Sequence, residues 1–338
     1  MPDDVVMHVE DFSVEYKTRI GWVSAVNDVS LEIKRGEILG LVGESGCGKS
    51  TLGKALMRMI PPPGRMMGHL WFKGLDLMTL PESEMRQIRG RNIGMIFQDP
   101  MTSLNPIQRV VDHLIETIRT HEPGVSRKAA RARAAELVDR LGISSRRLDD
   151  YPHQLSGGMR QRVMIGLALA LNADLIIADE ATTSLDVIVE AQFIELLQEL
   201  RHEFNLTILM ITHNIGLVAE VADRVAVMYA GRMAELGDVR DVFRGPLHPY
   251  TRALMNAVPN ILVDDDKLYK MEGSPPDLVT PPTGCRFHPR CPFVLPVCSQ
   301  LEPDFAAVGP DHLTSCWLFQ DIPAEYKIDV KESDHERS

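Results

Sequence analysis

Short apolar runs of strand length recur along this chain, and stretches with helical spacing lie between them. The apolar runs occupy residues 37–43, 92–98, 174–180 and 206–213. In 51–60 and in much of 101–150, apolar side chains recur every three or four positions, as they do in amphipathic helices. Buried strands that alternate with helices are typical of α/β proteins, so the pattern predicts an α/β fold with a mixed sheet.

The pattern changes on either side of this predicted core. Residues 5–35 alternate between polar and apolar side chains, which predicts a β-rich lead-in. Residues 68–77 and 224–238 alternate around a central turn, so each predicts a hairpin. Residues 245–310 are rich in Pro and Gly and lack strong periodicity, and the charged tail after about 322 is expected to be disordered.

The loop after the first buried strand carries the most specific motif. It reads GESGCGKST and fits the phosphate-binding pattern G-x-x-x-x-G-K-[ST]. Its glycines let backbone N–H groups approach phosphate oxygens, and Lys49 can reach the β- and γ-phosphates. Ser50 can ligate Mg²⁺, and Thr51 can support it. The predicted nucleotide-binding residues of this loop are Gly43, Glu44, Ser45, Gly46, Cys47, Gly48, Lys49, Ser50 and Thr51.

Polar side chains end three of the other predicted strands. Asp179 and Glu180 end the run at 174–180, where Asp179 suits Mg²⁺ and Glu180 suits the orientation or deprotonation of a water molecule. The plainer interpretation is a pair of helix-capping acids. Gln98 ends a second strand and His213 a third, and a lone His at a strand end is more often structural than catalytic. Ligands of α/β proteins bind at such carboxyl ends of parallel strands.

Two further features are compatible with nucleotide contacts. Ser156, Gly157 and Gly158 precede a predicted helix, where Ser156 is a good N-cap and free N–H groups can bind an anion. Tyr16 in the lead-in could stack on an adenine ring, because stacking requires only a flat π-face. A half-buried strand aromatic explains Tyr16 equally well.

Composition limits the class of protein. The 338 residues can hold one large domain and a smaller one, and 44% hydrophobic with 25% charged residues is ordinary for a soluble globular chain. The net charge of −11 argues against a dedicated nucleic-acid binder. Asn172 and Asp174 interrupt the longest apolar stretch, 163–178, which is shorter than a bilayer-spanning helix. We therefore expect a cytosolic protein, for which a partner would provide any membrane part.

Four of the five cysteines lie in the last sixth of the chain, with the spacing C-x5-C-x6-C-x17-C: Cys285, Cys291, Cys298 and Cys316. In a cytosolic protein such clustering predicts metal ligation before disulfides. The C-x₂₋₄-C pair usual for zinc is missing, which favours a [4Fe–4S] cluster. Zn²⁺ and free buried thiols remain the alternatives. The fifth, Cys47, lies beside Lys49 and is expected to be either a reactive thiolate or a small, unreactive loop residue.

Taken together, the motifs resemble those of the ATP-binding subunit of ATP-binding cassette (ABC) transporters. The phosphate loop matches Walker A, and residues 155–162 (LSGGMRQR) match the signature motif. The other matches, in the order of the family, are Tyr16 for the adenine-stacking aromatic, Gln98 for the Q-loop, 175–180 (LIIADE) for Walker B, 184–186 (SLD) for the D-loop and His213 for the switch histidine.

A narrower resemblance is to the oligopeptide/dipeptide importer branch. It is carried by FQDPMTSLNP (97–106), YPHQLSGGM (151–159), GPLHPYTRALMNAVP (245–259) and GCRFHPRCP (284–292). The last two match the C-terminal extension of that branch, whose members are similar in carrying the cysteine set. Ala181 departs from the family, where a proline usually follows the Walker B glutamate. Asn214 likewise replaces the aspartate that usually follows the switch histidine.

The resemblance implies an ABC cassette at 5–235 with a helical subdomain at about 101–155, a Cys-containing domain at 236–321 and a tail at 322–338. It implies a head-to-tail dimer with a second cassette, identical or paralogous, that binds two ATP molecules with Mg²⁺. The roles implied for single residues are Glu180 for the attacking water, His213 for the γ-phosphate, Ser50, Gln98 and Asp179 for Mg²⁺, and Ser156, Gly157, Gly158 and Asp186 for nucleotide contacts.

The implied partners are two transmembrane permease subunits at the cytoplasmic face of the membrane and, indirectly, an extracytoplasmic solute-binding protein. No nucleic acid is implied. The expected function is ATP-driven import of dipeptides or oligopeptides. The alternatives are import of nickel or another small solute, and a soluble non-transport ABC ATPase. An iron–sulfur regulatory module with an inactive cassette is disfavoured, because all catalytic positions are intact.

Overall fold

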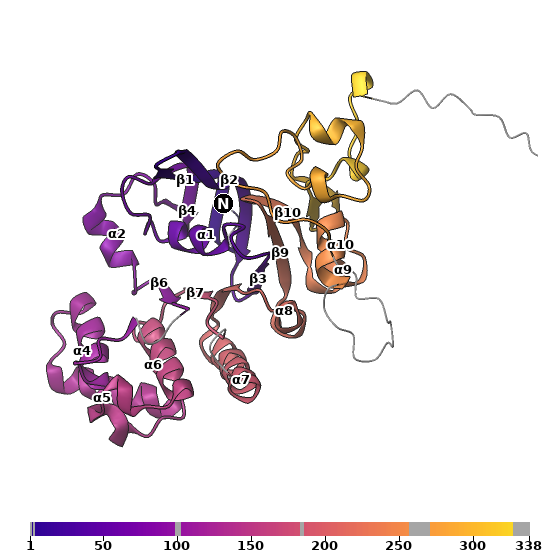
Figure 1. The fold of residues 1–338 in the computed structure, drawn as a ribbon. Coiled ribbons are helices and arrows are strands. Elements are labelled where there is room, and N and C mark those ends of the chain that lie inside the picture. The colour runs from indigo at the N-terminus through magenta and orange to yellow at the C-terminus, as the bar shows by residue number, and fades with distance from the viewer. Residues whose placement is uncertain (1, 3, 99–102, 183–185, 257–270, 327–338) are drawn as a thin grey trace, which may run out of the picture.

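The computed structural model of the chain describes residues 2, 4–98, 103–182, 186–256 and 271–326. Its strands form two sheets (Figure 1). Within the described residues, the smaller sheet has four antiparallel strands in the order β2-β1-β4-β5, and it contains the predicted lead-in. These strands are β1 Val5–Thr18, β2 Gly21–Lys34, β4 Arg65–Phe72 and β5 Leu75–Asp76.

The larger sheet has the order β11-β12-β10-β9-β3-β8-β7-β6 within the described residues. Neighbours from β9 to β6 are parallel, and the strands beyond β9 pair antiparallel, so the sheet is mixed as predicted. The parallel strands are near-continuous apolar runs because both of their faces are covered. Its strands are β3 Ile38–Val42, β6 Ile93–Ile96, β7 Leu175–Asp179, β8 Thr207–Ile211, β9 Arg224–Tyr229, β10 Arg232–Asp238, β11 Ala306–Gly309 and β12 His312–Thr314.

Both predicted hairpins are confirmed, and the backbone conformation of their turns explains why they form. β4 and β5 join through Lys73 and Gly74, and β9 and β10 join through Ala230 and Gly231. All four turn residues have positive φ, between 47° and 86°. Two consecutive positive φ angles define the turn whose twist matches that of paired strands, so a Gly at the second position lowers its cost.

Helices lie against the larger sheet and in a separate lobe. Figure 1 shows α4, α5 and α6 gathered in that lobe, away from α1 and the smaller sheet. The helices are α1 Lys49–Leu56, α2 Glu82–Ile88, α4 Val110–His121, α5 Arg127–Arg140, α6 Gly157–Leu169, α7 Val187–Phe204, α8 Ile215–Val221, α9 Val239–Arg244 and α10 Pro249–Asn256. Short 3-10 turns occupy Ser145–Asp149, Pro152–Gln154, His288–Arg290, Pro296–Ser299, Trp317–Phe319 and Ala324–Tyr326.

Two apolar cores hold these parts together. One joins the inner face of the helical lobe to one side of the larger sheet, and α4 buries Leu114, Ile115 and Ile118 in it. The other joins the smaller sheet to α1 and to the opposite side of the larger sheet, with Leu52 and Leu56 at its centre. The phosphate loop lies between β3 and α1 and is therefore held from both sides.

The C-terminal segment continues the larger sheet instead of forming a separate body. β12 pairs with β10, where Glu235 faces Thr314. The Glu235 carboxylate is fully buried and accepts the N–H groups of Leu247 and His248 at 2.8 and 2.9 Å. His312 Nε2 lies 2.8 Å from the same carboxylate. The predicted boundary between 235 and 236 thus falls inside β10, and the division into domains remains a prediction.

The predicted tail lies partly outside the described residues. Within them, Ile322 and Tyr326 pack against a small cluster formed by Val297, Cys298 and Trp317. Residues 327–338 are not described, so the prediction of disorder stays untested there. No helix among the described residues is long and apolar enough to cross a membrane.

Candidate nucleotide-binding site

The phosphate loop joins β3 to α1 in the strand–loop–helix order that the motif requires. Gly43 and Gly48 have φ of 152° and 107°, which disfavours any side chain. A Cβ at Gly43 would lie 2.1 Å from the Met228 carbonyl oxygen, and one at Gly48 would lie 2.2 Å from the Ala25 carbonyl oxygen. Both glycines are therefore needed for the loop to pack between β2 and β9.

Lys49 lies inside the loop and not in solvent. Its side chain is buried, and Nζ donates to the carbonyl oxygens of Gly43 and Glu44 at 2.7 and 3.1 Å. These two contacts hold the ammonium over the concave side of the loop. A phosphate bound by the loop's N–H groups would meet this charge directly.

Ser50 and Asp179 meet at the place predicted for Mg²⁺. Ser50 Oγ donates to Asp179 Oδ1 at 2.7 Å, which brings the first turn of α1 to the end of β7. Burial raises the pKa of Asp179, and the hydrogen bond from Ser50 opposes that rise. A hydroxyl and a carboxylate at hydrogen-bond distance are the oxygen ligands that Mg²⁺ takes in phosphate-binding sites.

Glu180 lies where β6, β7 and β8 end side by side, and it contacts the side chains that follow β6 and β8. Gln98 Nε2 donates to Glu180 Oε2 at 2.7 Å, and His213 Nδ1 lies 3.8 Å from Glu180 Oε1. Glu180 has φ of 48°, and its N–H donates to the Ile211 carbonyl oxygen at 2.9 Å. The residue thus turns out of the sheet, and its carboxylate points toward side chains that follow β6 and β8.

Ser156, Gly157 and Gly158 lie at a different place in the chain's fold. Ser156 Oγ accepts the Met159 N–H at 3.3 Å and caps α6, as predicted. A pocket of about 450 Å³ opens at this helix start, with Asp186 on its wall. Asp186 caps α7 by accepting the Val189 N–H at 2.9 Å. α6 lies in the helical lobe, apart from α1 (Figure 1), so the signature residues and the phosphate loop are not brought together within one chain.

Tyr16 is half-buried on β1 opposite Val23 and packs against the second core. Beside it, the Arg65 guanidinium stacks over the Trp22 ring at 4.1 Å. The geometry is compatible with both interpretations of Tyr16, and its adenine contact stays a prediction.

Cys47 is not poised as a thiolate. Its side chain is buried, and burial raises the pKa of the thiol, while nearby Lys49, 3.8 Å from Sγ, lowers it less. Burial therefore favours the interpretation as an unreactive loop residue, and the reactivity of Cys47 stays a prediction. The sequence showed the neighbouring positive charge but not that loop packing would exclude solvent from the sulfur.

The two departures from the family pattern have local partners. Asn214 caps α8 by accepting the Leu217 N–H at 3.2 Å, a role that an aspartate also performs. The Ala181 carbonyl oxygen accepts a hydrogen bond from the buried Gln161 side chain. Of the predicted D-loop, 184–186, residues 184 and 185 lie outside the described part of the chain, and Asp186 is the residue that caps α7.

Two residues that support the loop could not be found by motif alone. Tyr250 and Arg290 both contact Glu44. They belong to GPLHPYTRALMNAVP and GCRFHPRCP, two segments whose pattern indicates the C-terminal extension but not its contact with the loop.

The four C-terminal cysteines are free, and all are buried or half-buried. The Sγ atoms of Cys291 and Cys298 accept the N–H groups of Phe293 and Leu295, each at 3.4 Å. Burial raises the pKa of Cys285 to about 12 and that of Cys316 to about 11. Among the described residues, no three or more His, Cys, Asp or Glu side chains are grouped to hold a metal ion. The metal prediction is therefore not confirmed.

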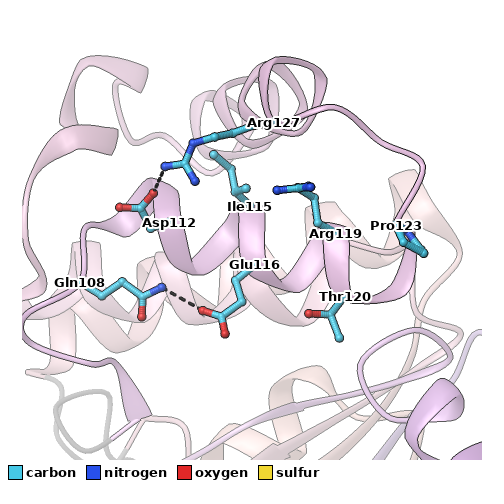
Figure 2. A pocket seen from close by; sticks show the side chains of 8 residues that line it. All are labelled: Gln108, Asp112, Ile115, Glu116, Arg119, Thr120, Pro123 and Arg127. Carbon is cyan, nitrogen blue, oxygen red and sulfur yellow. Dashed lines mark hydrogen bonds and ion pairs between the residues drawn. The ribbon is translucent and has the colours of Figure 1, made fainter.

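A second hollow lies on the helical lobe (Figure 2), where α4 and the start of α5 border a groove of about 600 Å³. Ion pairs and hydrogen bonds order its floor. Arg127 is paired with Asp112 at 2.5 Å, and Gln108 donates to Glu116 at 2.9 Å. Arg119 also lines it, so the groove presents both signs of charge.

Comparison with known proteins supports one family. The family model for ABC transporters matches residues 26–183, and the model for the C-terminal region of oligopeptide/dipeptide transporters matches 234–298. The chain is 45% identical to the dipeptide transport ATP-binding protein DppD of Bacillus subtilis over 96% of this chain and 97% of that one. It is also 45% identical to the oligopeptide transport ATP-binding protein OppD of Salmonella typhimurium over 94% of each chain.

Solved structures agree with this. A dimeric ATP-binding cassette in a post-hydrolysis state, bound to ADP and phosphate, superposes with a TM-score of 0.63 at 28% identity. The match covers 69% of this chain and 99% of that one. A dimeric bacterial ABC transporter cassette matches with a TM-score of 0.62 and the same coverage. The chain is an ATPase that belongs to the ATP-binding subunits of ABC transporters, in the oligopeptide/dipeptide transporter branch.

Proposed function

We propose that this chain hydrolyses ATP to drive the import of dipeptides or oligopeptides across the cytoplasmic membrane. The observation that carries the proposal is the 45% identity, over nearly the whole chain, to subunits named for dipeptide and oligopeptide transport. The match to the C-terminal region of that branch supports it, because the extension is the part in which this chain exceeds a bare cassette.

The proposed ATP contacts follow from the loop geometry. Gly43 to Thr51 surround the phosphates with N–H groups, and Lys49 supplies the positive charge between them. Ser50 and Asp179, joined at 2.7 Å, would hold Mg²⁺ together with Gln98, and the ion would neutralise charge on the phosphates. Tyr16 stacks on the adenine ring from β1.

Glu180 is the proposed acceptor for the attacking water's proton. Gln98 and His213 face its two carboxylate oxygens, and in the proposed site all three side chains would surround the position beyond the γ-phosphate. In this arrangement Gln98 orients the carboxylate and His213 contacts the γ-phosphate. Transfer of the proton to Glu180 accompanies attack of the water oxygen on phosphorus and departure of ADP.

The complete site requires a second cassette in a head-to-tail dimer. Ser156, Gly157 and Gly158 border a pocket at the start of α6 but lie in a different lobe from their own phosphate loop. In the partner's site their N–H groups would face the γ-phosphate, where the positive end of a helix stabilises negative charge. Asp186 on the same pocket would join that contact. ATP bound between two cassettes favours the closed dimer over the open one.

The helical lobe is the proposed contact with two transmembrane permease subunits. Its open groove beside α4 (Figure 2) is lined by apolar Ile115 and by side chains of both charges, a surface suited to a short amphipathic segment. The subunit would therefore lie peripherally at the cytoplasmic face, and an extracytoplasmic solute-binding protein would deliver the peptide. The proposed function involves no nucleic-acid partner.

Reconstitution of the complex tests the proposal. The chain, its partner cassette and its permeases are placed in proteoliposomes with the binding protein, and uptake of labelled di- to pentapeptides and of Ni²⁺ is measured. Peptide uptake that requires ATP supports the proposal. Uptake of Ni²⁺ alone, or ATP hydrolysis that neither peptide nor permease alters, would reject peptide import in favour of another solute or of a non-transport ATPase.

We also propose that Cys285, Cys291, Cys298 and Cys316 hold a structural [4Fe–4S] cluster. Each sulfur accepts a backbone N–H bond, and the four thiols are close enough to influence one another's charge. Such N–H bonds are the second-shell contacts of cluster thiolates, and they support the proposal. Iron, sulfide and zinc analysis of anaerobically purified protein decides the matter: zinc without sulfide, or neither metal, rejects the cluster.

A further inference from the structure

Among the described residues, the hydrogen bonds from the C-terminal extension to the phosphate loop converge on Glu44. The Glu44 N–H donates to Tyr250 Oη at 2.8 Å. The Arg290 guanidinium donates to both Glu44 carboxylate oxygens, at 2.8 and 3.0 Å. Tyr250 and Arg290 come from two separate segments of the extension, so both the backbone and the side chain of Glu44 are fixed from outside the cassette motif.

The side chains of Tyr250 and Arg290 are themselves held by other contacts. The Tyr250 ring is fully buried between Tyr229 and Phe287, with centroid distances of 4.5 and 5.5 Å. The Arg290 side chain is only 6% exposed and also donates to Tyr229 Oη at 3.2 Å and to the Glu272 carbonyl oxygen at 3.0 Å. Neither side chain can move away from Glu44 without breaking contacts of its own.

Glu44 in turn sets the interior of the loop. Its carbonyl oxygen accepts Lys49 Nζ at 3.1 Å and the Cys47 N–H at 3.2 Å. A rotation of the Glu44 peptide would therefore displace the lysine that meets the phosphates and the backbone that follows. Fixing a loop in its bound conformation increases affinity, because less conformational entropy is lost on binding.

We propose that Tyr250 and Arg290 are positioning residues that hold the phosphate loop in its nucleotide-binding conformation, so that the extension sets the affinity for nucleotide. The proposal concerns the nucleotide site alone and does not depend on which solute is transported. Since the contact does not involve the reacting atoms, it acts on ground state and transition state alike. Its loss should raise the Kd and KM for nucleotide and leave kcat nearly unchanged.

The test uses the purified full-length chain and two conservative variants. Tyr250→Phe removes only the hydroxyl, and Arg290→Lys keeps the charge but loses the two-pronged contact. MgADP affinity is measured by calorimetry, and hydrolysis in the assembled complex gives KM and kcat. We expect each variant to raise the Kd for MgADP by about three- to thirtyfold, which lies within the range of coupling between neighbouring residues.

Glu302→Gln is the matched control. It breaks another ion pair between extension and cassette, with Arg232 at 2.5 Å, that does not touch the loop. Its Kd for MgADP should equal that of the parent. A Tyr250→Phe variant with parental far-UV dichroism and unchanged Kd would overturn the proposal. So would an equal loss of affinity in Glu302→Gln, because the contacts at Glu44 would then have no special effect.

Discussion

Glu180→Gln is the substitution with the clearest expected effect on hydrolysis. The glutamine has the same size, and its amide oxygen can still accept the hydrogen bond that Gln98 makes at 2.7 Å. The local geometry is thus kept, and what is lost is the group that takes a proton. General-base catalysis is worth about 10²- to 10⁴-fold. The kcat should therefore fall by that factor, equivalent to roughly 3–5 kcal/mol in the barrier.

Binding should be spared, because the loop's contacts with phosphate do not involve Glu180. The assay combines phosphate release by the assembled complex with calorimetric titration of MgATP into the variant. Glu195→Gln, on the exposed side of α7, is the control for loss of one carboxylate charge, and it should hydrolyse ATP as the parent does. Hydrolysis by Glu180→Gln within about threefold of the parent would refute the reasoning, since no base worth 10²-fold could then reside there.

Three other outcomes are expected. Lys49→Ala should weaken MgATP binding by at least about tenfold in calorimetry, since it removes a charge-assisted phosphate contact; unchanged affinity would contradict the site. Cys47 should resist alkylation at neutral pH until denaturant is added, because burial raises its pKa; rapid labelling of the native protein would show otherwise. Burial lowers the pKa of His248 from 6.5 to about 4, because the folded protein disfavours the charged imidazole. The neutral ring therefore leaves the fold at its full stability above pH 6.5, and this stability is lost as the ring must be protonated toward pH 4. The free energy of unfolding should drop by up to about 3 kcal/mol over that window in denaturant titrations, and His248→Gln should abolish this part of the slope.

The sequence was sufficient where a motif and its strand–helix context coincide. Gly43 to Ser50 specify both a loop conformation and a binding chemistry, and the glycine spacing has no other common explanation. The strand-end residues Gln98, Glu180 and His213 were placed correctly at one edge, because parallel strands put their carboxyl ends together. That these three side chains contact each other depends on the positive φ of Glu180, which no pattern indicates.

The sequence pattern could not predict how segments far apart in the chain pack against each other. The thiol of Cys47 is buried because Gly43 and the loop close over it, and a Cβ at Gly43 would lie 2.8 Å from the sulfur. The neighbouring Lys49 predicted the opposite effect on its pKa. Similarly, Tyr250 is separated from Glu44 by 206 residues, so only the fold reveals that one supports the other.

The described part of the extension has little apolar interior of its own, and this explains its contacts with the cassette. Among the described residues, its own core is the small cluster around Val297, Cys298 and Trp317. The other large side chains, Tyr250 and Phe287, are buried in the core of the cassette instead. Its hairpin β11-β12 completes the cassette's sheet through β10. A segment that obtains its stability from the cassette must transmit its own changes to it, and Glu44 is where that transmission reaches the nucleotide.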